Sequence, residues 1–75
     1  MPVCEWTEGL SIFDDYTNFI GIIHDGYVFN ENNERTHSVS PDGDIYELDS
    51  KRYIGTIEDD GDIHCNGQVV GYWVE

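Results

Sequence analysis

The clearest indication of the fold is Ile57-Glu58-Asp59-Asp60-Gly61-Asp62-Ile63 (residues 57–63), an acidic turn between two isoleucines. An Asp-Gly step flanked by β-branched residues is a strong hairpin signal, because glycine takes the positive φ of a tight turn without steric cost. The same figure recurs in residues 39–45, around Asp42-Gly43, and in residues 22–28, around Asp25-Gly26. These turns predict three hairpins spread along the chain.

The chain divides into four repeats around these turns. Each repeat opens with a β-branched residue followed by an aromatic residue or histidine, at intervals of 16, 17 and 18 residues: Ile12-Phe13, Val28-Phe29, Ile45-Tyr46 and Ile63-His64. Each repeat then continues with a returning segment. This segment has glycine at one shared position in three repeats, Gly21, Gly55 and Gly71, and His37 at that position in the second repeat. The repeats span residues 9–24, 25–40, 41–57 and 58–74.

The repeats predict an all-β fold in one small domain, residues 1–75. Alternating apolar residues between turn signals predict an antiparallel meander of about eight short strands. We expect the four hairpins to close into a ring, because closure buries their apolar faces and removes exposed edges; a two-sheet β-sandwich is the alternative. The expected strands are residues 10–13, 19–24, 27–30, 36–40, 44–48, 52–58, 62–65 and 68–74, with Asn66-Gly67 as a type I′ turn.

Three further expectations concern single positions. The glycines at 21, 55 and 71 should allow close backbone approach near the centre of the ring. Trp6 should cover one end of the core. Phe13, Phe29, Tyr46 and His64 should lie on the sheet face opposite the core residues, because side chains alternate along a strand.

The four-copy pattern resembles the four-fold β-flower domains, small bacterial proteins whose repeats carry a strand glycine and an Asp-Gly turn. The resemblance covers residues 9–74 and rests on the segments Ile20-Gly21-Ile22, Ile54-Gly55-Thr56 and Val70-Gly71-Tyr72 together with the Asp-Gly turns. The second copy departs from it with Thr36-His37-Ser38, and the first lacks a clean Asp-Gly. The resemblance implies a fold and little about activity.

Charge is the strongest functional signal in the sequence. The 75 residues hold 16 acidic and 3 basic side chains, a net charge of −13. Such a surface disfavours nucleic acid and anionic membranes and favours basic proteins or cations. The start of the chain has no signal-peptide pattern and no run has transmembrane length, so we expect a cytoplasmic protein. Cys4 and Cys65 are therefore expected to be free thiols, with a disulfide as the less favoured alternative.

The turns of one kind should meet at one end of a meander and collect carboxylates there. The candidate partner-binding residues are Asp25, Asp42, Asp44, Glu58, Asp59, Asp60 and Asp62, with Tyr27 and Tyr46 as aromatic anchors. Asp14, Asp15, Glu31, Glu34 and Asp49 would line the other rim. Carboxylates along a rim imitate duplex phosphates and suit a groove built to bind nucleic acid. In size and charge the chain resembles small acidic inhibitors made by phages and mobile elements, including anti-restriction and anti-CRISPR proteins.

Other functions have weaker support. The carboxylates are equally explained as solvated turn residues. Calcium could use Asp42, Asp44 and Asp49 or Asp59, Asp60 and Asp62, but neither set has the spacing of an EF-hand. Zinc could use His24, His37, His64 and Cys65, which lack ligand spacing. We expect no cofactor and no enzyme, since no nucleophile has a marked base. Two alternatives remain. One is a structural or oligomerising β-flower module, which would form a homo-oligomer, and the other is a small-ligand or cation-binding protein.

Overall fold

The computed structural model describes residues 4–75, which form a short 3-10 segment followed by eight strands. The strands alternate with turns along residues 4–75, as the repeats predict, and their bounds differ from the expected ones by at most one residue. The elements are η1 (Glu5–Thr7), β1 (Ser11–Asp14), β2 (Phe19–His24), β3 (Tyr27–Phe29), β4 (Arg35–Val39), β5 (Asp44–Glu47), β6 (Tyr53–Ile57), β7 (Asp62–Cys65) and β8 (Gln68–Val74).

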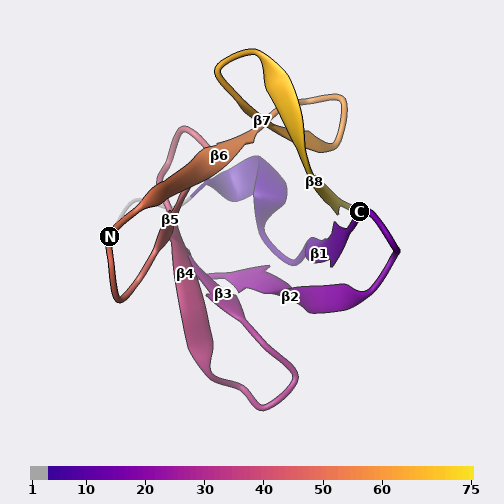
Figure 1. The fold of residues 1–75 in the computed structure, drawn as a ribbon. Helices are drawn as coiled ribbons and strands as arrows, with labels where there is room; N and C mark the ends of the chain where they lie inside the picture. Colours follow the sequence, from indigo (N-terminus) through magenta and orange to yellow (C-terminus); the bar gives the residue numbers. More distant parts are fainter. Residues whose placement is uncertain (1–3) are drawn as a thin grey trace.

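The strands form a closed barrel in chain order (Figure 1). Each strand pairs antiparallel with the next, and β8 returns to pair with β1, where Ile12 faces Val74 and Phe13 faces Trp73. Ser11 and Glu75 exchange two backbone hydrogen bonds of 3.0 Å beyond this pair, and the Trp73 indole N–H donates to the Asp14 carbonyl at 2.9 Å. The closed meander is confirmed, and the two-sheet sandwich is wrong.

The core repeats with the sequence. Every repeat contributes one buried β-branched residue from each of its two strands, and side chains on the strand face opposite these core residues point outward. Phe13, Phe29, Tyr46 and His64 occupy that outer face, as the alternation predicts. The eight core residues are Ile12, Ile23, Val28, Val39, Ile45, Ile57, Ile63 and Val74.

One end of the barrel is plugged by the segment that precedes β1. Cys4 and Thr7 are buried there, and the Thr7 hydroxyl donates to the Cys4 carbonyl at 2.9 Å. Gly9 N–H donates to the Ile23 carbonyl at 2.8 Å and ties this segment to β2. The expected role of Trp6 is wrong, because its side chain is 50% exposed. The smaller side chains of Cys4 and Thr7 fill this narrow end of the barrel in place of the indole.

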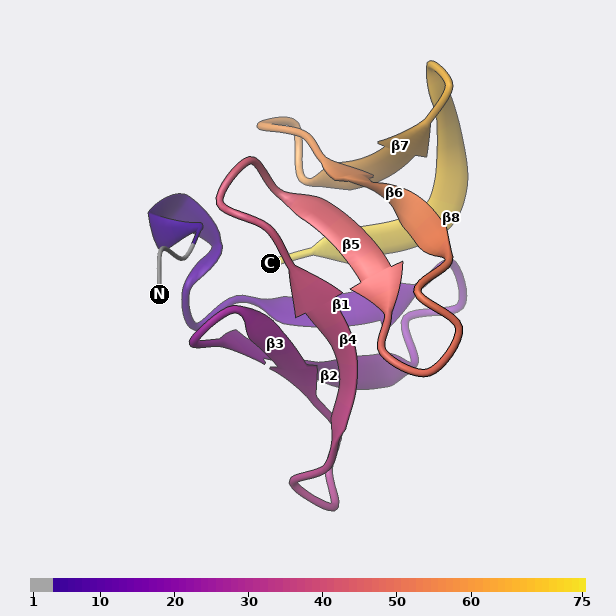
Figure 2. The ribbon, with the colours of Figure 1, turned by 90° about the vertical axis from the view of Figure 1, so that its left-hand side faces the viewer.

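The two ends of the barrel are formed by different turns (Figure 2). We call one the plugged end; it holds η1, the C-terminal residue and the turns that join β2 to β3, β4 to β5 and β6 to β7. We call the other the open end; it holds the remaining four turns. The two-residue turns at Asp25-Gly26 and Asn66-Gly67 have positive φ at both residues, 54° and 83° and then 54° and 81°. These values confirm the type I′ prediction for Asn66-Gly67.

Both cysteines are free thiols, as expected. Cys4 lies in the plug, whereas Cys65 ends β7 at the open end. No helix among residues 4–75 is long and apolar enough to cross a membrane.

Glycine is required where neighbouring strands approach most closely. A Cβ atom on Gly21 would lie 2.6 Å from the Phe29 carbonyl oxygen, and one on Gly55 would lie 2.7 Å from Cγ2 of Ile63. The prediction of close approach is therefore confirmed at these two positions. It is wrong at Gly71, where a Cβ would meet nothing nearer than 3.7 Å and φ is +87°. There glycine is needed for a backbone irregularity in β8, where the register with β7 shifts.

We expect Gly21→Ala and Gly55→Ala each to lower the free energy of unfolding by about 1 to 3 kcal/mol, the usual effect of overpacking a core. Val69→Ala is a suitable control, because Val69 is 55% exposed and its truncation should change stability by less than about 0.5 kcal/mol. Urea denaturation followed by tryptophan fluorescence measures all three. Wild-type midpoints for both glycine variants would contradict the proposed contact between the strands.

Candidate protein-binding surface

Charge is divided unequally between the two ends of the barrel. Among residues 4–75, ten of the sixteen acidic side chains belong to the plugged end and its flanking strand starts, and none of the three basic side chains does. Arg35, Lys51 and Arg52 all lie at the open end, beside the other six acidic residues. The acidic residues of the plugged end, which we call the acidic rim, are Glu5, Glu8, Asp25, Asp42, Asp44, Glu58, Asp59, Asp60, Asp62 and Glu75.

The structure therefore brings all seven predicted carboxylates to one end. Five of them are exposed, while Asp44 and Asp62 are half-buried at the starts of β5 and β7. Glu5, Glu8 and Glu75 were missed, because their place on this rim follows from the plug and from the β1–β8 pairing. No repeat pattern in the sequence contains them.

The two predicted tyrosines lie on the outer face beside this rim. Tyr27 and Tyr46 both pair with Ser38, which stands between them on β4. Together with Asp25 and Pro41 they surround an outer hollow of about 330 Å³. A carboxylate and two aromatic rings around one hollow form a surface suited to a cationic side chain, because the faces of aromatic rings attract cations.

The aromatic surface extends to β6 through Tyr53, which is not among the predicted partner-binding residues. The Tyr53 ring lies 5.6 Å from the Tyr46 ring, between ring centroids. The Thr56 hydroxyl donates to an Asp44 carboxylate oxygen at 2.6 Å and is 2.5 Å from the Tyr53 hydroxyl. The position of Tyr53 opposite Tyr46 in the register was the signal available for finding it. This contact network holds Asp44 and both rings in place.

A second outer hollow lies next to the acidic turn of residues 57–63. It measures about 380 Å³ and is lined by Tyr53, Thr56, Asp59, Asp60 and His64 with the Asn66-Gly67 turn. It therefore continues the same outer face from β6 to β7. Tyr27, Tyr46, Tyr53 and the acidic rim above them form one surface, which we call the rim face.

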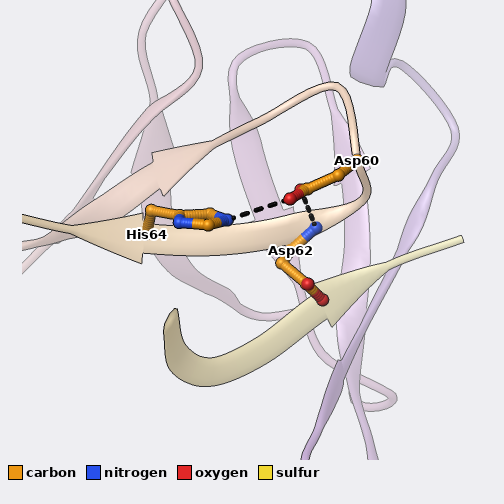
Figure 3. A group of neighbouring side chains, drawn as sticks. All are labelled: Asp60, Asp62 and His64. Atoms are coloured by element: carbon orange, nitrogen blue, oxygen red, sulfur yellow. Dashed lines mark hydrogen bonds and ion pairs between the residues drawn. The ribbon is translucent and has the colours of Figure 1, made fainter. Parts of the chain in front are cut away.

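Asp60, Asp62 and His64 converge at the edge of this surface (Figure 3). The Asp62 N–H donates to Asp60 Oδ1 at 2.8 Å, and His64 Nε2 lies 3.2 Å from Asp60 Oδ2. One ligand atom from each residue lies within 4.8 Å of the others, so this is the set of described residues that could hold a divalent metal ion. It combines members of the two separate sets that the sequence suggested for calcium and zinc. Asp60 is bonded to both neighbours without an ion, whereas no hydrogen bond to the Asp62 carboxylate occurs among residues 4–75.

The remaining zinc candidates lie apart from this set. His24 Nδ1 is 2.7 Å from a Glu8 carboxylate oxygen at the plugged end. His37 Nδ1 is 2.9 Å from the Thr36 hydroxyl on β4. Cys65 ends β7 at the open end. His24 and His37 thus each have a different local partner, and Cys65 is not a member of the Asp60, Asp62 and His64 cluster.

Hydrogen bonding holds the pKa of Asp60 below its ordinary value. The largest cause is the hydrogen bond from the Asp62 backbone N–H. Desolvation raises the pKa by less than this bond lowers it, and His64 lowers the pKa further. Because the folded-state pKa is lower than the unfolded one, this bonding stabilises the fold above about pH 4, and the benefit is lost as pH falls through the folded-state pKa.

We therefore expect Asp60→Asn to lose less stability than the wild type when the pH is lowered from about 5 to 2. Asp59→Asn is the matched control, because no hydrogen bond to the Asp59 side chain occurs among residues 4–75. Thermal unfolding at a series of pH values gives the comparison. Identical acid limbs for wild type and Asp60→Asn would show that these bonds do not act in solution.

Comparison with protein-family models, with curated proteins and with solved structures finds no match to this chain.

Proposed function

We propose that the protein binds the basic surface of a partner protein through its rim face and competes there with nucleic acid. The observation that carries this proposal is the separation of charge along the barrel: among residues 4–75, the plugged end carries ten acidic residues and no basic one. A surface of one sign attracts and orients a partner of the opposite sign at long range. No chemical reaction is part of the proposal.

The spacing of the rim supports mimicry of a phosphate backbone. The carboxylates stand on three successive turns around one circumference, so they present charge along an arc instead of at a point (Figure 2). A groove lined with lysine and arginine recognises such an arc through charge pairing, as it does a nucleic acid backbone. An inhibitor of a nucleic-acid-binding protein would work by occupying that groove.

The tyrosines would add the anchoring contacts that charge alone does not supply. Exposed ion pairs are each worth little, whereas aromatic residues at the centre of an interface contribute a large share of binding. An arginine already stacks on this kind of ring within the chain, because the Arg35 guanidinium carbon lies 4.8 Å from the Tyr27 ring centroid. We expect partner arginines to contact Tyr46 and Tyr53 in the same way.

The test replaces four carboxylates of the rim without changing their shape. We expect the variant Glu58→Gln, Asp59→Asn, Asp60→Asn and Asp62→Asn to bind its partner about thirtyfold more weakly at low salt. Four exposed charge pairs at roughly 0.5 kcal/mol each give about 2 kcal/mol. Immobilised protein would first capture nucleic-acid-binding proteins from a cell extract, with duplex DNA as competitor. The affinity for an identified partner is then measured at 50 and 500 mM salt, conditions about threefold apart in screening length.

The matched control removes the same number of charges from the other end. The variant Asp15→Asn, Glu31→Gln, Glu34→Gln and Asp49→Asn keeps the rim intact and has the same net charge as the first variant. It should bind the partner nearly as well as the wild type, and both variants should retain the wild-type circular dichroism. Equal loss in both variants would reduce the effect to net charge, and no loss in either would refute the proposed surface.

A further inference from the structure

The open end of the barrel contains a hollow that the proposed function does not use. It measures about 320 Å³ and lies at the opposite end from the acidic rim. Its floor is made by core isoleucines of β1, β5 and β7, its walls by Ile20 and Ile54, and its mouth by His37, Glu47 and Tyr72. Small-molecule sites in proteins have this character, with apolar walls and a few polar groups, and barrel mouths are a common place for them.

Two repeats have no side chain at one inward position of the barrel. Gly21 and Gly55 face Ile12 and Ile45 across the register, and neither could carry a Cβ without colliding with the next strand. The neighbouring strand takes up the space at these glycines, and the hollow itself is lined by isoleucines of two other positions and of the core. An eight-stranded barrel is wide enough to hold one small ligand when its own side chains do not fill it.

The second repeat departs from this pattern at the same place. It carries His37 where the first and third repeats have glycine, and this residue lines the hollow. A position that breaks a repeat rule at the mouth of an apolar hollow is where function is expected to override fold regularity. Burial lowers the pKa of His37 more than nearby Glu47 raises it, so the imidazole is neutral at neutral pH.

The hydrogen bonds around His37 define what its ring offers to a ligand. The Thr36 hydroxyl donates to the Val28 carbonyl at 3.4 Å, so its oxygen is left to accept from His37 Nδ1 at 2.9 Å. We assign the proton of the neutral ring to Nδ1 on the basis of these two bonds. His37 Nε2 is then a hydrogen-bond acceptor.

Glu47 supplies a second acceptor beside it, because His37 and Glu47 are paired in the register of β4 and β5. The Ser50 hydroxyl donates to Glu47 Oε1 at 2.6 Å, and Arg52 Nε lies 3.4 Å from the same oxygen. This bonding lowers the pKa of Glu47, which keeps it charged. No partner of Glu47 Oε2 occurs among residues 4–75. The ion pair between Arg52 and Glu47 is exposed and therefore weak, so it competes little with a ligand for the Glu47 carboxylate.

We propose that this hollow binds a small primary amine with an apolar body, with the ammonium group at Glu47 and His37 and the apolar part against Ile20 and Ile54. Glu47 and His37 Nε2 both accept hydrogen bonds at the mouth, and Glu47 is an anion, so a donor with positive charge matches them. The net charge of −13 adds to the preference for a cation over an anion. A carboxylate of the same size should be excluded.

The test uses three probes of nearly equal size and different polar groups: phenethylamine, 2-phenylethanol and phenylacetate. Each is titrated into the full chain while methyl and histidine ring signals are followed by NMR. We expect phenethylamine to give saturable shifts of the Ile20, Ile54 and His37 signals. The alcohol should bind at least tenfold more weakly and the carboxylate should not bind. Absence of saturable shifts with the amine, or equal affinity for the carboxylate, would overturn the proposal.

Three variants separate the parts of the site. Glu47→Gln should weaken the amine about tenfold and leave the alcohol unchanged, because only the charge is removed. His37→Gly copies the other repeats, so it should fold and bind both probes more weakly. Ile54→Phe should fill the hollow and abolish both. Glu34→Gln removes a charge at the same end outside the hollow and should bind like the wild type. Unchanged amine affinity in Glu47→Gln, with a wild-type spectrum, would refute the assigned ammonium position.

Discussion

The pairing of β1 with β8 is the constraint on which the rest of this structure depends. Without it, the meander would be an open sheet with two exposed edges, and its apolar face would be exposed to water. With it, the eight core residues contributed in equal pairs by the four repeats face one another inside a ring. The Trp73 indole, stacked on Phe13 with ring centroids 4.6 Å apart, covers this joint from outside. A chain of this size has little other apolar area with which to hold itself together.

The antiparallel meander also separates charge between the two ends of the barrel. Successive turns alternate between these ends, so residues that are scattered in the sequence are sorted by turn parity. The sorting places the Asp-Gly turns with the plug and places Arg35, Lys51 and Arg52 at the other end. Like charges on one rim repel and lower stability. The fold tolerates this cost because most of these carboxylates are exposed and well hydrated.

The departures from four-fold symmetry are as informative as the symmetry. Gly21 and Gly55 keep the repeat rule and let neighbouring strands approach closely. His37 breaks the rule and puts a polar ring at the mouth of the open-end hollow. Gly71 has the same place in the sequence repeat but a different structural reason, since it serves a register shift in β8 next to the closing pair. A chain that only needed to fold would have no use for the polar ring at position 37.

Much of this architecture was determined by the sequence alone. Local rules govern turns and alternation, so the eight strands, the inward-facing residues and the gathering of the Asp-Gly carboxylates at one end could be predicted. Contacts between distant segments could not be predicted: that Cys4 and Thr7 fill the plugged end while Trp6 is exposed, and that Glu5, Glu8 and Glu75 join the acidic rim. Those outcomes depend on barrel diameter and strand register. Both are set only when the last strand meets the first, because ring closure fixes every distance across the interior at once.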